Sequence, residues 1–196
     1  MDNLEEKRSW WKWLFFGLEM VFTVLSLAYY FYLTIQGTAL PQTYTWLVIV
    51  CTQTPIAIAE FRNEGGLASW GIAIGAGLCL LLFVTSVALG GYVFITPNDM
   101  IMLLFIFITI AIWMKVKNDF LAVVLLSVID SAGYYFTAKK IFFEPGSEVL
   151  SVWIMLTLSC LFAALAVDKF NKENITYPVT TTITGTIICV MIALIH

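Results

Sequence analysis

Seven long apolar runs occupy most of this chain and decide what it can fold into. They cover residues 12–35, 44–61, 67–89, 98–114, 119–139, 149–168 and 175–195. Each run is continuously apolar rather than alternating, which is typical of a buried helix and not of a barrel strand. About 20 such residues span a bilayer as a helix, and lipid requires that backbone groups be satisfied within the segment. The sequence therefore predicts an all-α integral membrane protein with seven transmembrane helices.

The composition agrees with a chain that lies almost entirely in the lipid bilayer. Hydrophobic residues make up 61% of the 196 positions and charged residues only 12%, about half of what soluble domains carry. No small-residue cleavage site follows the first run, so residues 1–11 are predicted to be a cytoplasmic tail ahead of a retained helix. The net charge of -3 and the lack of a basic cluster argue against a nucleic-acid partner.

Two short stretches indicate an internal duplication. Residues 26–31 (SLAYYF) and 131–136 (SAGYYF) match at four of six positions. Each copy is followed by a proline, a tryptophan near the start of the next run and an acidic residue near its end. These residues are Pro41, Trp46 and Glu60 after the first copy, and Pro145, Trp153 and Asp168 after the second. The fourth run has no counterpart, so we expect a three-helix repeat over 12–89, a linker helix over 98–114 and a second, parallel repeat over 119–195.

Lysine and arginine positions predict the orientation. If all seven runs cross, eight of these residues lie on the side of the N-terminus and two on the other side. The eight are Lys7, Arg8, Lys12, Arg62, Lys115, Lys117, Lys169 and Lys172, and the two are Lys139 and Lys140. This bias predicts a multi-pass protein of the cell (inner) membrane with the N-terminus in the cytoplasm and the C-terminus outside. Lys139 and Lys140 lie close in sequence to Glu144 and Glu148, which suggests either an outer gate or a solvated loop with weak ion pairs.

The arrangement of three, one and three helices resembles the superfamily of SWEET sugar facilitators, PQ-loop proteins and nicotinamide-riboside transporters. The chain is also similar to small bacterial membrane proteins of unknown function that carry an Asp, a Thr-x-x-Lys and a Pro-x-x-Glu around helices five and six. Here these are Asp130, Thr137–Lys140 and Pro145–Glu148, with Phe136 where that group often has a proline. The resemblance implies passage of a small polar solute by alternating access. SWEET proteins place the N-terminus outside, opposite to the charge count.

Polar groups inside the apolar runs are the candidate solute-binding residues. Asp130 lies near the middle of the fifth run, where a carboxyl group needs water, a polar partner or a proton, and Glu19 lies about a third of the way along the first. Thr52 and Gln53 belong to the most polar stretch within any run, beside Pro55, which is a candidate hinge. The alternatives are that Asp130 only bonds to a neighbouring hydroxyl, that the Glu19 side chain reaches the membrane interface, and that the segment with Pro55 is a simple helix kink.

Aromatic residues form a second set of candidates. Tyr29 and Tyr134 are placed to stack on a ring-containing solute, although such residues more often serve helix packing. Trp46 and Trp153 are expected in the aromatic belt at the membrane interface, with a ligand role as the alternative.

These patterns favour a small-solute transporter or facilitator, with the bilayer and the solute as its partners. The alternative left open is a non-transport subunit or scaffold of a larger complex, which would have no continuous cavity between the halves; a homo-oligomer is also left open. The chain is not expected to be an enzyme, because it lacks HExxH, Gly-x-Ser-x-Gly and paired catalytic aspartates. Its last run has no lysine for a retinal Schiff base. No cofactor or metal is expected, because Cys51, Cys79, Cys160 and Cys189 lie in separate runs without CxxC spacing.

Overall fold

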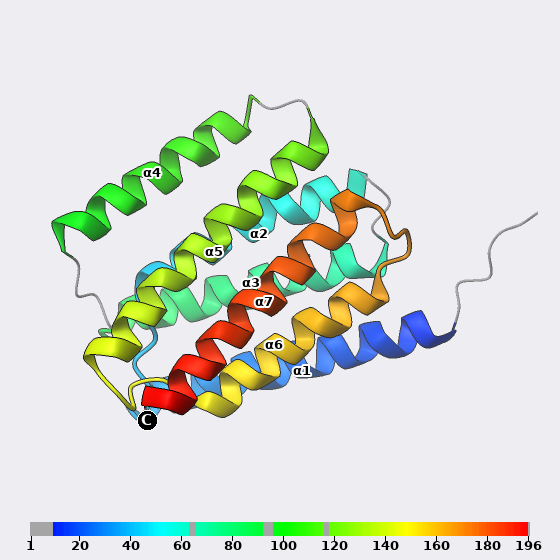
Figure 1. Cartoon of the computed structure of the whole chain (residues 1–196). Helices are drawn as coiled ribbons and strands as arrows, with labels where there is room; N and C mark the ends of the chain where they lie inside the picture. The colour runs from blue at the N-terminus through cyan, green and yellow to red at the C-terminus, as the bar shows by residue number, and fades with distance from the viewer. Residues whose placement is uncertain (1–9, 63–65, 92–95, 116–117, 196) are drawn as a thin grey trace, which may run out of the picture.

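The computed structural model describes residues 10–62, 66–91, 96–115 and 118–195, and the chain is all-helical within them (Figure 1). Its helices are α1 (Trp10–Ile35), α2 (Thr43–Arg62), α3 (Leu67–Ala88), α4 (Pro97–Trp113), α5 (Asp119–Phe143), α6 (Leu150–Ala166) and α7 (Lys172–Ile195). The all-α prediction is confirmed, and each apolar run gives one helix. Of the charges that predict the orientation, Lys7, Arg8 and Lys117 lie outside the described residues, as do residues 1–9 of the predicted tail.

Among the described residues, five helices are long and apolar enough to cross a membrane. They are α1, α2, α3, α7 and the Phe120–Phe143 part of α5. The other two, α4 and α6, are apolar but have 17 residues each, about 25 Å of helix. These lengths and compositions are those of an all-α, membrane-embedded protein.

The end of α5 differs most from the sequence expectation. The fifth run was predicted to end at residue 139, at the pair of lysines, but the helix continues to Phe143. Lys139 pairs with Asp99 at the start of α4, and Lys140 pairs with Glu148 just before α6. Because each ammonium group has an acidic partner, the lysines need not leave the helix for water.

Six helices form a ring, and α4 lies outside it along α5 (Figure 1). Around the ring the order is α1, α3, α2, α5, α7 and α6, and α6 closes the ring by packing along α1. The helices of the two predicted repeats thus meet mainly where α2 packs on α5 and where α6 packs on α1.

Glycine residues allow neighbouring helices of the ring to approach closely. A Cβ atom on Gly133 of α5 would lie 2.7 Å from the side chain of Val48 on α2. A Cβ atom on Gly185 of α7 would lie 2.5 Å from the hydroxyl of Thr157 on α6. Both distances are shorter than van der Waals contact. These helices can therefore lie this close only because glycine has no side chain.

Candidate functional site

A cavity lies inside the ring of six helices. Its volume is about 70 Å³, counted as space open to the centres of water molecules. About 10–15 Å³ on this measure holds one water, so the cavity has room for about five. Lining residues come from α1, α2, α3, α5, α6 and α7, and therefore from both predicted repeats.

Three of the predicted site residues line this cavity: Glu19, Gln53 and Tyr134. Glu19 is only 4% exposed. Its Oε2 atom and the Oε1 atom of Gln53 have no hydrogen-bond partner among the described residues. An unpartnered buried acceptor costs free energy, so native structures rarely keep one without a reason. Two such acceptors in one cavity suit a site that receives hydrogen bonds from a ligand.

Asp130 and Thr52 lie directly behind the lining. Both are fully buried, and the Thr52 hydroxyl donates a hydrogen bond to Oδ1 of Asp130. The hydroxyl of Tyr177, a lining residue that the sequence analysis missed, lies close to the same carboxyl group. Asp130 therefore joins α5 to α2, and its second oxygen, Oδ2, has no hydrogen-bond partner among the described residues.

Tyr29 and Pro55 are the predicted residues that lie away from the cavity. The side chain of Tyr29 is 42% exposed on the outside of α1, whereas the neighbouring Tyr30 is fully buried. Pro55 lies within α2, which continues unbroken to Arg62. The Thr54 hydroxyl donates to the carbonyl group of Val50, one turn earlier in the helix. The role of Pro55 as a hinge stays a prediction.

Trp46 and Trp153 were expected in the interfacial belt, and this expectation is wrong. The two side chains are 2% and 1% exposed, and they line one end of the cavity. Their rings stack on each other with centroids 6.3 Å apart. Tyr30 packs on Trp46 and Tyr134 packs on Trp153, each pair with centroids 5.7 Å apart. The indole N–H of Trp153 has a protein partner, Glu148, so it does not need the membrane interface.

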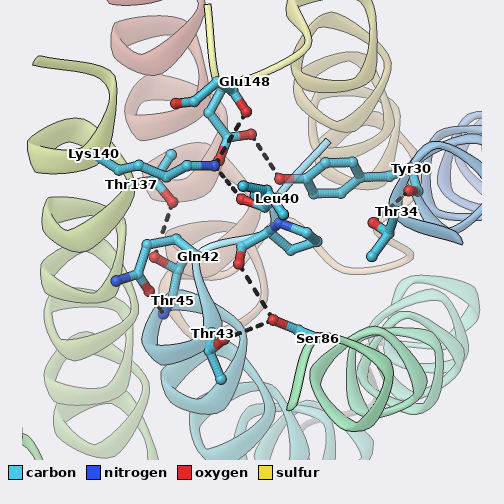
Figure 2. A network of polar contacts seen from close by, with 12 residues as sticks. Tyr30, Thr34, Leu40, Gln42, Thr43, Thr45, Ser86, Thr137, Lys140 and Glu148 are labelled. Carbon is cyan, nitrogen blue, oxygen red and sulfur yellow. Dashed lines mark hydrogen bonds and ion pairs between the residues drawn. The ribbon is translucent and has the colours of Figure 1, made fainter. Parts of the chain in front are cut away.

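A buried ion pair of Lys140 and Glu148 lies next to Trp153, whose indole donates to Glu148; Figure 2 shows the pair. Nζ of Lys140 is 2.9 Å from Oε1 of Glu148, and neither side chain is more than 1% exposed. Nζ also donates hydrogen bonds to the carbonyl groups of Leu40, before α2, and Ser147, before α6. The lysine thus has three acceptors, as many as an ammonium group can use.

The carboxyl group of Glu148 is equally well satisfied. Its second oxygen, Oε2, accepts a 2.7 Å hydrogen bond from the hydroxyl of Tyr30 on α1 and a 3.0 Å hydrogen bond from the indole of Trp153 on α6. The expectation of a solvated loop with weak ion pairs is therefore wrong for Lys140 and Glu148. Together Lys140, Glu148, Tyr30 and the Leu40 carbonyl form what we call the terminal cluster, which ties α1 to α5 (Figure 2).

Hydroxyl groups continue this polar contact between α2 and α5. Thr45 bonds to Thr137 over 2.9 Å and donates to the carbonyl of Gly133 over 3.1 Å. The Asp130, Thr137, Lys140 and Glu148 side chains on which the bacterial resemblance rests are all buried, and each has a polar partner. Sequence spacing placed these residues around helices five and six, but their partners on α1 and α2 are distant in sequence and carry no local signal.

Comparisons with family models, with curated proteins and with solved structures find no match to this chain. Within the described ranges, no three His, Cys, Asp or Glu side chains gather as ligands for a metal ion. The cavity and the terminal cluster are therefore the features from which a function is argued.

Proposed function

We propose that this protein is a small-solute transporter or facilitator that works by alternating access between two three-helix units, residues 12–89 and 119–195. The observation that carries the proposal is the cavity, because it lies between these units and holds the unpartnered oxygens of Glu19 and Gln53. Pockets with a few convergent polar groups at the junction of repeats are typical solute sites in transporters. A scaffold has no use for such a cavity.

The order of neighbouring helices supports two equivalent units. In the first unit α3 lies between α1 and α2, and in the second α7 lies between α5 and α6. The tyrosine-tryptophan pairs also correspond, since Tyr30 with Trp46 and Tyr134 with Trp153 have the same ring separation. The match of residues 26–31 with 131–136 aligns Tyr30 with Tyr135 instead, so the two pairs are alike in geometry but differ by one residue in register. The 3+1+3 resemblance to SWEET and PQ-loop proteins and nicotinamide-riboside transporters fits this arrangement.

The terminal cluster serves as the gate at one end of the cavity in this proposal. It joins Tyr30 and Leu40 of the first unit to Lys140 and Glu148 of the second, beyond the stacked tryptophans. Separation of the units at this end would break these contacts together. Alternating access requires a contact set of this kind, formed in one state and broken in the other.

Uptake by purified protein in proteoliposomes tests the proposal. The assay uses labelled sugars, amino acids, amines and nucleosides, and protein-free liposomes give the background. Gln53→Leu removes an acceptor from the cavity and should lower the uptake of the transported solute about tenfold or more. Thr54→Val is the matched control, because Thr54 is exposed and its hydroxyl bonds only to its own helix.

Two results would contradict the transporter proposal. One is that no solute crosses faster than in protein-free liposomes. The other is that Gln53→Leu and Thr54→Val transport equally well. Either result would favour the alternative of a non-transport subunit or scaffold.

A further inference from the structure

The cavity holds two unpartnered hydrogen-bond acceptors, and three of its hydroxyl groups are already engaged. The lining hydroxyls of Thr157, Ser159 and Thr181 already donate to carbonyl groups of their own helices, over 2.8, 2.7 and 3.0 Å. No lysine or arginine is among the described residues that line the cavity. The unpartnered oxygens of Glu19 and Gln53 therefore need N–H or O–H groups that a solute brings with it.

The position of Glu19 depends on glycine in the facing helix. A Cβ atom on Gly71 of α3 would lie 1.8 Å from Oε1 of Glu19, so only glycine leaves the carboxyl group where it is. Gly75, one turn later, also lines the cavity, and a Cβ atom there would make only an ordinary van der Waals contact, 3.7 Å, with Oε1 of Gln53. Two helices thus hold an acidic group against the cavity wall with no positive charge beside it in the lining.

Aromatic rings make up much of the remaining wall. The lining includes the rings of Trp46, Trp153, Tyr134 and Tyr177. The face of an aromatic ring carries partial negative charge and attracts cations, more strongly when water is excluded. An acidic residue and several aromatic residues in one lining both favour a positively charged solute.

We propose that the solute of this cavity is a small protonated amine, whose ammonium group donates hydrogen bonds to Glu19 and Gln53. The inference rests on the proposed function and names the class of solute for the same cavity. The volume of about 70 Å³ sets the size of the solute at a few non-hydrogen atoms beyond the amine. Two acceptors suit the N–H groups of an amine better than a bare metal ion, which takes about six oxygen ligands.

Calorimetric titration of the purified protein with n-butylammonium tests this inference. Uncharged 1-butanol has the same number of non-hydrogen atoms and is the matched probe. We expect n-butylammonium to bind and 1-butanol to bind at least about tenfold more weakly, since hydrogen bonds to charged groups are the stronger ones. Glu19→Gln keeps the shape and should weaken n-butylammonium binding about tenfold or more, whereas Glu173→Gln, at the start of α7 and outside the cavity lining, should not.

Gly71→Ala provides a second variant that leaves the carboxyl group in the protein but displaces it. It should also weaken n-butylammonium binding, because the added methyl group takes the space of Oε1 of Glu19. The inference is overturned if n-butylammonium does not bind, if 1-butanol binds equally well, or if Glu19→Gln binds as the wild type does.

Transport and amine recognition can fail separately. Glu19-dependent binding of n-butylammonium without any solute flux in proteoliposomes would retain the amine site and refute the transporter. Flux of a neutral solute that Glu19→Gln leaves intact would retain the transporter and refute the amine site.

Discussion

The buried pair of Lys140 and Glu148 gives the sharpest stability prediction. Removal of one partner from a buried ion pair leaves the other charge uncompensated and costs about 3–5 kcal/mol. We expect a loss of this size for Lys140→Met, which leaves Glu148 with only the Tyr30 and Trp153 donors. We expect a similar loss for Glu148→Gln, which removes the carboxylate charge opposite the buried ammonium group of Lys140.

The double variant separates the pair from its surroundings. Lys140→Met with Glu148→Gln leaves no charge to compensate, and the glutamine can still accept a hydrogen bond from Tyr30 or Trp153. Its loss should therefore be smaller than the sum of the single losses by about 2–3 kcal/mol, which is the coupling energy of groups in direct contact. Equilibrium unfolding in mixed micelles with a rising fraction of SDS, followed by circular dichroism, measures each free energy.

Glu144→Gln is the control for this cycle. Glu144 lies four residues before Glu148 and is exposed, so its replacement should change the free energy of unfolding by less than about 0.5 kcal/mol. The reasoning would be refuted if the single variants at 140 and 148 lose less than about 1 kcal/mol each, or if their losses add without coupling.

Three further predictions concern the helix contacts, the buried aspartate and the orientation. Gly133→Ala should cost about 1–3 kcal/mol in the same unfolding assay, because its methyl group would meet Val48, while Gly17→Ala, with open space around it, should cost nothing. Asp130→Asn should abolish uptake or its pH dependence in a folded protein, and a change in stability alone would make Asp130 structural. Single cysteines at 146 and 115 should be reachable from outside and protected, respectively, in intact cells; the reverse labelling would overturn the orientation.

The fold class could be predicted because apolar run length is a local property. Each run gave a helix, and most bounds agree within one or two residues. The largest error, at the end of α5, has a non-local cause. Lys139 and Lys140 predict a helix end because charged side chains are normally exposed to water. In the structure they form ion pairs with Asp99 and Glu148, which belong to other parts of the chain. Sequence patterns of one helix cannot show such partners.

The site was predicted less completely for the same reason. Glu19 and Gln53 stood out as polar groups within apolar runs, and both line the cavity. Tyr177 has no comparable signal, since a tyrosine near a helix start is common. The choice between Tyr29 and Tyr30 depends on the rotation of α1, and an adjacent residue on a helix points about 100° away. Only the packing of α1 on α6 and α3 decides which of the two tyrosines is buried.

The distribution of satisfied polar groups bears on which end of the proposed transporter is closed. Within the terminal cluster, the ammonium group of Lys140 and both oxygens of Glu148 have partners, although the hydroxyl of neighbouring Ser147 has none among the described residues. In the opposite half, Glu19 keeps an oxygen without a partner, and fully buried Glu60, near the end of α2, has none for either oxygen among the described residues. A carrier is closed at the end where its gate contacts are formed. It binds its solute from the end where hydrogen-bond acceptors have no partner. On the proposed function, the structure therefore corresponds to a state closed at the terminal cluster, and breaking the pair of Lys140 and Glu148 should favour the opposite state.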